Sequence, residues 1–119
     1  MGVFVRVRGW LDCDEDHLAG ARAVIAAHAH EHYSRGWVIR DHIPGYTPCV
    51  LYTGDLREHW LDWLLTQVRA IAALPARDDD HVRGLFFAMH ETRGTTTWRV
   101  HAGQVSPASP PQGLAYLDE

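Results

Sequence analysis

The sequence contains no lysine, so every basic side chain apart from histidine is an arginine. A Schiff-base lysine, a P-loop lysine and a Ser-Lys dyad are therefore excluded. The motifs H-E-x-x-H, G-x-S-x-G, C-x-x-C and G-x-G-x-x-G are also absent. The only serines, Ser34, Ser106 and Ser109, lie in stretches typical of loops rather than at a nucleophile elbow. These absences predict a protein that is not an enzyme and that needs no cofactor.

Long apolar runs are missing as well, and none approaches the roughly 20 residues that a membrane-spanning helix needs. The N-terminus, MGVFVRVRGW, alternates apolar residues with arginines and lacks the continuous apolar region of a signal peptide. We therefore expect a cytoplasmic protein without membrane contact. The chain has only two cysteines, Cys13 and Cys49. They could pair, but two free thiols are the expected state.

What remains is the composition of an ordinary globular domain. The 119 residues are 46% hydrophobic and 22% charged, and this length suffices for one buried core but not for two. We expect a single domain over residues 1–119, with a compact body at 1–106 and a proline-rich C-terminal extension at 107–119. The extension is expected to be extended, with Leu114, Tyr116 and Leu117 able to dock on the body.

The N-terminal part alternates apolar and polar residues between positions 3 and 11, which predicts a strand. Its valines share one face, and the other face carries Phe4, Arg6, Arg8 and Trp10. Acidic residues from Asp12 onward then favour a helix N-terminus. Apolar residues at helical spacing continue this first helix to about His32, and Gly36 follows as its stop.

The middle of the chain contains the clearest helical pattern. Residues 37–40 and 49–52 predict two strands, and Gly54-Asp55 is expected to end the second of them. Asp55 with Glu58 matches a capping box, and an apolar stripe then predicts a second helix that Pro75 closes. The stripe consists of Trp60, Leu64, Val68 and Ile71.

The last third of the chain is expected to be mostly strand. Residues 75–81 are polar and predict an exposed loop. The nearly continuous apolar run within residues 83–91 is typical of a central strand covered on both faces. Arg93-Gly94 predicts a turn into a partner strand at 95–101, and a short strand follows around Val105.

These elements together predict an α+β fold. Its sheet is mostly antiparallel, with about five to six strands and with two helices packed on one face. The order of the elements corresponds to a split βαβ arrangement with additional C-terminal strands.

The nine histidines raise the question of a metal site. If the first helix persists, His28 and His32 lie on one face at the i and i+4 spacing that can hold one ion. A zinc site needs three or four ligands, and the spacing identifies no further one. The favoured interpretation is that these histidines lie near a helix C-terminus, where partial positive charge suits the helix dipole.

Two acidic clusters and one tryptophan are the candidate partner-binding residues: Asp12, Asp14, Glu15, Asp16, Asp78, Asp79, Asp80 and Trp63. The clusters are either a helix cap and a solvated loop or a negative surface that attracts a basic partner. Trp63 falls at the edge of the apolar stripe. It is therefore either an interface anchor or, as we favour, a cover for a second core surface.

Direct binding of nucleic acid is not expected. The formal net charge is −4, and the arginines are scattered along the sequence. Arg6 and Arg8 share a strand with Trp10, as on a sheet surface where RNA bases stack. Without a wider basic patch, however, the contribution from phosphate neutralisation would be small.

Five segments, in their order along the chain, resemble small bacterial immunity proteins: RGWLDCDEDHL, HYSRGWVI, VLYTGDLREHWLDWL, RGLFFAMHE and TTTWRV. The resemblance spans about Arg8 to Val105, and Gly36-Trp37 and Tyr52-x-Gly54-Asp55 are its most distinctive pieces. Immunity proteins accompany polymorphic or contact-dependent toxins and neutralise them by binding. The resemblance therefore implies a cytosolic inhibitor of a toxin, commonly a nuclease, and it carries over no catalytic residue.

The leading hypothesis is thus a non-enzymatic immunity protein whose acidic clusters meet a basic toxin surface. The alternative is a metal-binding protein or metal-dependent enzyme that uses His28 and His32. An exposed strand edge or a surplus tryptophan is also compatible with a homodimer.

Overall fold

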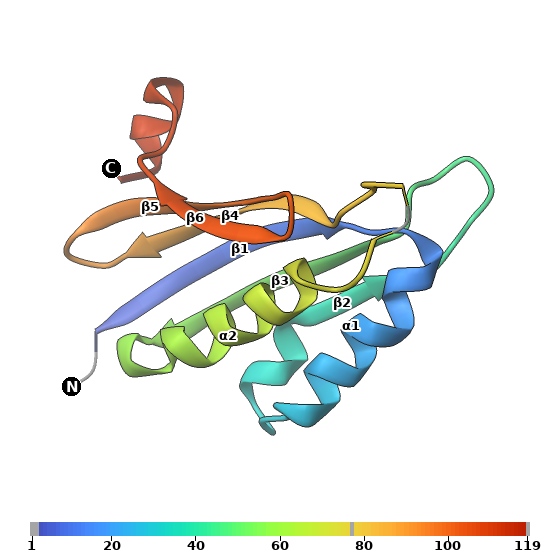
Figure 1. The fold of residues 1–119 in the computed structure, drawn as a ribbon. Coiled ribbons are helices and arrows are strands. Elements are labelled where there is room, and N and C mark those ends of the chain that lie inside the picture. Colours follow the sequence, from blue (N-terminus) through green and yellow to red (C-terminus); the bar gives the residue numbers. More distant parts are fainter. Residues whose placement is uncertain (1–2, 77, 119) are drawn as a thin grey trace.

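Six antiparallel strands form one sheet in the computed structural model, which describes residues 3–76 and 78–118. The strands are β1 (Phe4–Asp12), β2 (Trp37–Arg40), β3 (Cys49–Arg57), β4 (Arg83–His90), β5 (Gly94–His101) and β6 (Gln104–Ala108). The helices α1 (Glu15–Ala27) and α2 (Leu61–Ala72) lie together on one side of this sheet (Figure 1). Short 3-10 helices occupy Tyr33–Gly36, Glu58–Trp60 and Gln112–Asp118.

The strand order is β2-β3-β1-β4-β5-β6. β1 is central because it pairs with β3 on one side and with β4 on the other. The unit from β1 to β4 is therefore a split βαβ arrangement, and β5 and β6 extend the sheet as a meander. The predicted α+β fold is confirmed.

The core lies between the sheet and the two helices, because burial alternates along the strands. β1 turns Val5, Val7 and Leu11 toward the helices, and all three are fully buried. From the predicted stripe, α2 buries Leu64, Val68 and Ile71 completely. Each such side chain stabilises the fold by about 1.5–3 kcal/mol relative to an exposed position.

α1 ends at Ala27, so the predicted continuation to about His32 was wrong. His28 is the C-cap residue, and its Nδ1 bonds to the carbonyl oxygen one turn earlier at 2.8 Å. The backbone N–H groups of His32 and Tyr33 then donate to Nδ1 of His30. Because this ring fixes a turn after the helix, His28 and His32 do not share a helix face.

β3 continues through Gly54-Asp55 to Arg57, so the predicted strand end was also wrong. Both residues pair with β1, which makes them part of the ladder rather than of a turn. The predicted capping box of Asp55 and Glu58 is not formed. α2 begins at Leu61, and its N-cap residue is Trp60, without a side-chain capping hydrogen bond.

β4 lies in the middle of the sheet but is covered on one face only. Phe86 and Ala88 are buried against the helix layer. Leu85, Phe87 and Met89 alternate with them and are only partly buried. The expectation of a strand covered on both faces was therefore wrong. The partly buried apolar residues of β4 lie on the side of the sheet that faces away from the helices.

The C-terminal segment forms the 3-10 helix Gln112–Asp118 rather than an extended chain. It follows β6 and lies near the start of β5 (Figure 1), and the Thr95 hydroxyl donates to the Asp118 carboxylate at 2.5 Å. Leu114 and Leu117 are half-buried, whereas Tyr116 stays exposed.

Candidate functional site

We call the sheet face opposite the two helices the open face. It consists of the even-numbered residues of β1, β2 and β6 and the odd-numbered residues of β3, β4 and β5, as the alternation and the register require. Neither α1 nor α2 covers it (Figure 1). A sheet face without a covering layer is ordinarily polar, so its composition is informative.

An apolar row crosses the open face over four adjacent strands. Val38 on β2 pairs with Leu51 on β3, Leu51 pairs with Trp10 on β1, and Trp10 pairs with Leu85 on β4. The exposed fractions of Val38, Leu51 and Trp10 are 52%, 38% and 39%. Contiguous exposed apolar side chains of this size mark interaction sites more often than isolated ones do. The row is therefore the principal candidate for contact with a partner.

The segment from Asp41 to Pro48 continues this apolar surface beyond the sheet. Its Ile43 and Tyr46 form an isolated bridge, and both side chains are exposed. The guanidinium carbon of Arg40 lies 4.9 Å from the centre of the Tyr46 ring. Arg22 of α1 pairs with Asp41 at 2.7 Å and connects the segment to the helix layer. The segment projects beyond β2 and β3 (Figure 1), and it adds an aromatic ring next to Arg40 of the open face.

Arginine dominates the charge of the open face. The described strands place six arginines on it and two carboxylates: Arg6, Arg8, Arg40, Arg57, Arg83, Arg99, Asp12 and Asp55. Asp55 pairs with two of these arginines, with 3.3 Å to Arg8 and 3.6 Å to Arg6. The arginines that are scattered in the sequence are therefore gathered in the structure. The wider basic patch that the sequence did not reveal is present.

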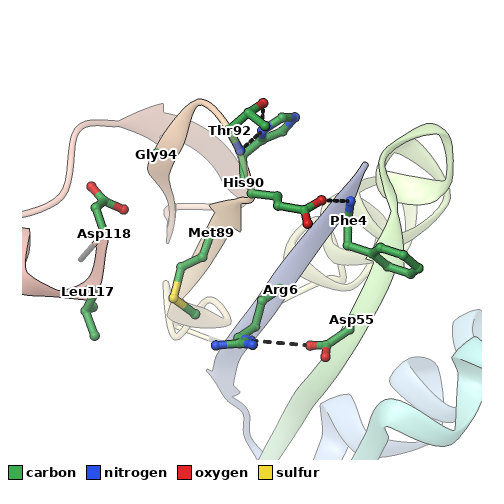
Figure 2. A pocket seen from close by; sticks show the side chains of 10 residues that line it. Phe4, Arg6, Asp55, Met89, His90, Thr92, Gly94, Leu117 and Asp118 are labelled. Carbon is green, nitrogen blue, oxygen red and sulfur yellow. Dashed lines mark hydrogen bonds and ion pairs between the residues drawn. The ribbon is translucent and has the colours of Figure 1, made fainter. Parts of the chain in front are cut away.

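An open depression of about 610 Å³ lies at one end of the open face, next to the C-terminal 3-10 helix. Figure 2 shows it between the Arg6–Asp55 pair and the side chains of Leu117 and Asp118. The Glu91 carboxylate at its rim accepts a hydrogen bond from the backbone N–H of Phe4 at 3.1 Å. Its charged groups thus hold strands and termini together, and we interpret the depression as the margin of the open face.

The distinctive pieces of the family resemblance meet around the ring of Tyr52. A Cβ on Gly36 would lie 2.7 Å from Cζ of this ring, and a Cβ on Gly54 would lie 2.8 Å from its hydroxyl oxygen. Trp37 packs edge-on against the ring at 5.0 Å between centroids, and the hydroxyl donates to the Tyr33 carbonyl oxygen at 2.9 Å. These glycines therefore make room for a buried aromatic residue rather than forming a contact surface.

Burial raises the pKa of Tyr52 from 10.0 to about 12. The folded state binds this proton more tightly than the unfolded state, so the stabilisation is complete below pH ~10 and is lost as the pH rises toward ~12. At about 1.4 kcal/mol per pKa unit, we expect a loss of roughly 2–3 kcal/mol. Urea denaturation of Tyr52→Phe across this range should show a weaker fall in unfolding free energy, with Tyr116→Phe as control. Equal slopes for Tyr52→Phe and the unmodified chain would contradict the assignment.

The two predicted acidic clusters lie together beside the N-terminus of α1. Asp14 is the N-cap residue, and its backbone N–H donates to Nδ1 of the buried His17 at 3.0 Å. A hydrogen bond with the Asp80 carboxyl raises the pKa of Asp14. Asp78 and Asp79 are exposed loop residues with positive φ angles. Of the predicted set, only Asp12 lies on the open face.

Trp63 belongs to the helix layer rather than to the open face. It is half-buried against the core, and its Nε1 donates to the His28 carbonyl oxygen at 2.9 Å. Its ring lies 6.1 Å from that of Trp60. These contacts agree with the favoured role as a cover for core surface, and its role in partner binding stays a prediction.

The metal alternative depends on a group of ligands. Within residues 3–76 and 78–118, no three side chains of His, Cys, Asp or Glu are grouped so that they could hold a metal ion. Cys13 and Cys49 are free thiols. Cys13 lies on the core side, where burial raises its pKa to about 12, and Cys49 is on the open face next to Asp12.

Comparison with known proteins finds no matching family model, no matching curated protein and no matching solved structure. No helix in the part of the chain that the structure describes is long and apolar enough to cross a bilayer. A functional proposal must therefore rest on the residues of the open face and their arrangement.

The open face was missed as a site at the level of sequence, although its signal was present. The pattern of β1 already placed Phe4, Arg6, Arg8 and Trp10 together on one face. The apolar run of β4 was assigned to a doubly covered strand, which concealed the fact that Leu85 lies in register with Trp10.

Proposed function

We propose that this chain is a non-enzymatic protein-binding module, and that it acts as an immunity protein that holds a cognate toxin domain against its open face. The observation that carries the proposal is the apolar row of Val38, Leu51, Trp10 and Leu85, in which the first three side chains are exposed and Leu85 is partly buried. Burying apolar surface stabilises a complex by roughly 25 cal/mol per Å² before the costs of association. An uncovered row of this kind is therefore a source of binding energy.

The composition around the row also supports protein binding. Tryptophan, tyrosine and arginine are the residues most enriched at the energetic centres of protein interfaces. Trp10 lies within the row, Arg99 is at its end opposite Leu85, and Tyr46 extends it beside Arg40. The charged groups of the neighbouring depression are engaged in bonds within the chain, which favours docking over turnover.

The test is binding to the toxin domain encoded next to this chain's gene. Purified chain and toxin domain should elute together at micromolar concentration. Leu51→Gln combined with Val38→Gln should weaken the complex by about 10-fold or more, because both side chains lose apolar contact. The matched control is Thr66→Gln, an exposed position on α2.

Three results would contradict the proposal. The first is that the two proteins elute separately, and the second is that no toxin domain is encoded nearby. The third is that Thr66→Gln weakens the complex as much as Leu51→Gln with Val38→Gln does. A self-association of the chain that the Leu51 and Val38 substitutions abolish would instead assign the row to a second copy of this chain.

A further inference from the structure

The charge on the open face is opposite in sign to that of the chain. The formal net charge is −4, yet the open face carries six arginines and two aspartates. The remaining surface must therefore hold an excess of negative charge. Part of that excess is the acidic group at the N-terminus of α1, which consists of Asp14, Glu15 and Asp16 with Asp80 close to Asp14. The molecule thus has a basic apolar face and an acidic end.

We infer that the partner presents an acidic protein surface with an apolar centre to the open face. This inference rests on the proposed function and specifies the chemistry of the partner. Arg40 and Arg99 lie at opposite ends of the apolar row, next to Val38 and Leu85. Carboxylates of a partner that covers the row would meet a guanidinium at each end, which fixes orientation and speeds encounter.

The inference reverses the expectation of a basic toxin surface. That expectation assumed that the acidic clusters make the contact. In the structure, Asp14 and Asp80 are beside the N-terminus of α1, whereas the exposed apolar side chains are among arginines. The fully buried centre of an interface is more apolar than its polar rim, so the apolar row is the expected centre, and the charges around it select the partner.

A protein fits the open face better than a single-stranded nucleic acid does. Val38, Leu51 and Leu85 are aliphatic, and they gain most from covering by apolar side chains. Trp10 supplies one stacking surface within the row, whereas platforms for single strands place successive bases on aromatic rings. The acidic end beside α1 would also repel a long polyanion.

The experiment measures the association rate with the neighbouring toxin domain at about 20 and about 200 mM salt. Arg40→Glu with Arg99→Glu should lower the rate at low salt by about 10-fold or more and remove most of its salt dependence. The control is Arg35→Glu with Arg69→Glu, which changes the net charge equally at two exposed positions in the helix layer. Its rate should stay within about 2-fold of the unmodified chain.

Each other outcome has a distinct meaning. If Arg40→Glu with Arg99→Glu accelerates association while Asp14→Arg with Asp80→Arg slows it, the partner surface is basic. The inference is then wrong, although the proposed function stands. If the chain binds labelled oligo(dT) or oligo(U) and the Arg40→Glu, Arg99→Glu variant does not, the partner is a nucleic acid and the inference is wrong. If the unmodified chain does not associate with the toxin domain at all, the proposed function itself fails.

Discussion

Gly84→Ala should lower the free energy of unfolding of the chain by about 3 kcal/mol. A Cβ at this position would lie 1.9 Å from the carbonyl oxygen of Trp10 and 3.0 Å from Cα of Leu11. Both atoms belong to the backbone of the central strand, which is held on its other side by β3 and cannot move away. Overpacking of a close-packed interior costs about 1–3 kcal/mol and occasionally more. We expect the upper end of that range, because only backbone atoms are available to yield.

The measurement is urea denaturation followed by circular dichroism. Gly113→Ala is the matched control, because a Cβ at Gly113 meets nothing within 4 Å. A domain of this size typically has an unfolding free energy of about 5–15 kcal/mol, so a loss above 3 kcal/mol is easily resolved. Equal denaturation midpoints for the two variants would show that the register of β1 against β4 is not as described.

Trp10→Ala should weaken binding of the toxin domain by about 30-fold or more, the loss typical of a central interface tryptophan. The side chain is 39% exposed and lies in the middle of the apolar row, so truncation removes contact area from the partner more than from the core. Isothermal titration calorimetry of the folded variant measures the effect directly.

Trp63→Ala is the informative comparison, because Trp63 is the tryptophan that the sequence indicated as a candidate interface anchor, although a core role was favoured, whereas Trp10 is exposed in the apolar row. The Trp63 variant loses the hydrogen bond to the His28 carbonyl oxygen and its ring contacts, and its unfolding free energy should fall. Its affinity for the toxin domain should remain within a few-fold of the unmodified chain. If the affinities change in the reverse order, the helix layer and not the open face binds the partner.

Elements with strong local patterns could be predicted from the sequence. Residues 37–40 were predicted as a strand with the bounds of β2, and the alternation that defines β1 gave the correct faces. The stripe on α2 predicted its buried side, since Leu64, Val68 and Ile71 are all in the core. These patterns succeed because the period of burial is encoded in neighbouring residues.

Features that depend on distant residues could not be predicted. Gly54-Asp55 has the composition of a turn, yet Gly54 pairs with Val7 and Asp55 pairs with Arg6 on β1, a strand far away in the sequence. The first helix gives way to a turn in which the His30 ring packs against the rings of Trp60 and Trp63 from the second helical region. Local propensity favours the other outcome in both cases, and tertiary contacts override it.

The open face is the clearest example of this limit. Its six arginines lie on five strands, and only the strand order brings them to one side of the sheet. Likewise, no pair among Val38, Leu51, Trp10 and Leu85 is close in sequence. A surface assembled across a sheet has no local sequence pattern. The candidate binding residues that the sequence indicated therefore lie mostly outside the open face.

The most direct test of the open face as the docking surface is methyl cross-saturation by NMR in the complex with the neighbouring toxin domain. Saturation of the toxin should attenuate the methyl signals of Val38, Leu51 and Leu85, while those of Leu61 and Leu65 on α2 keep their intensity. Attenuation confined to α2 would place the partner on the helix layer and would contradict the account.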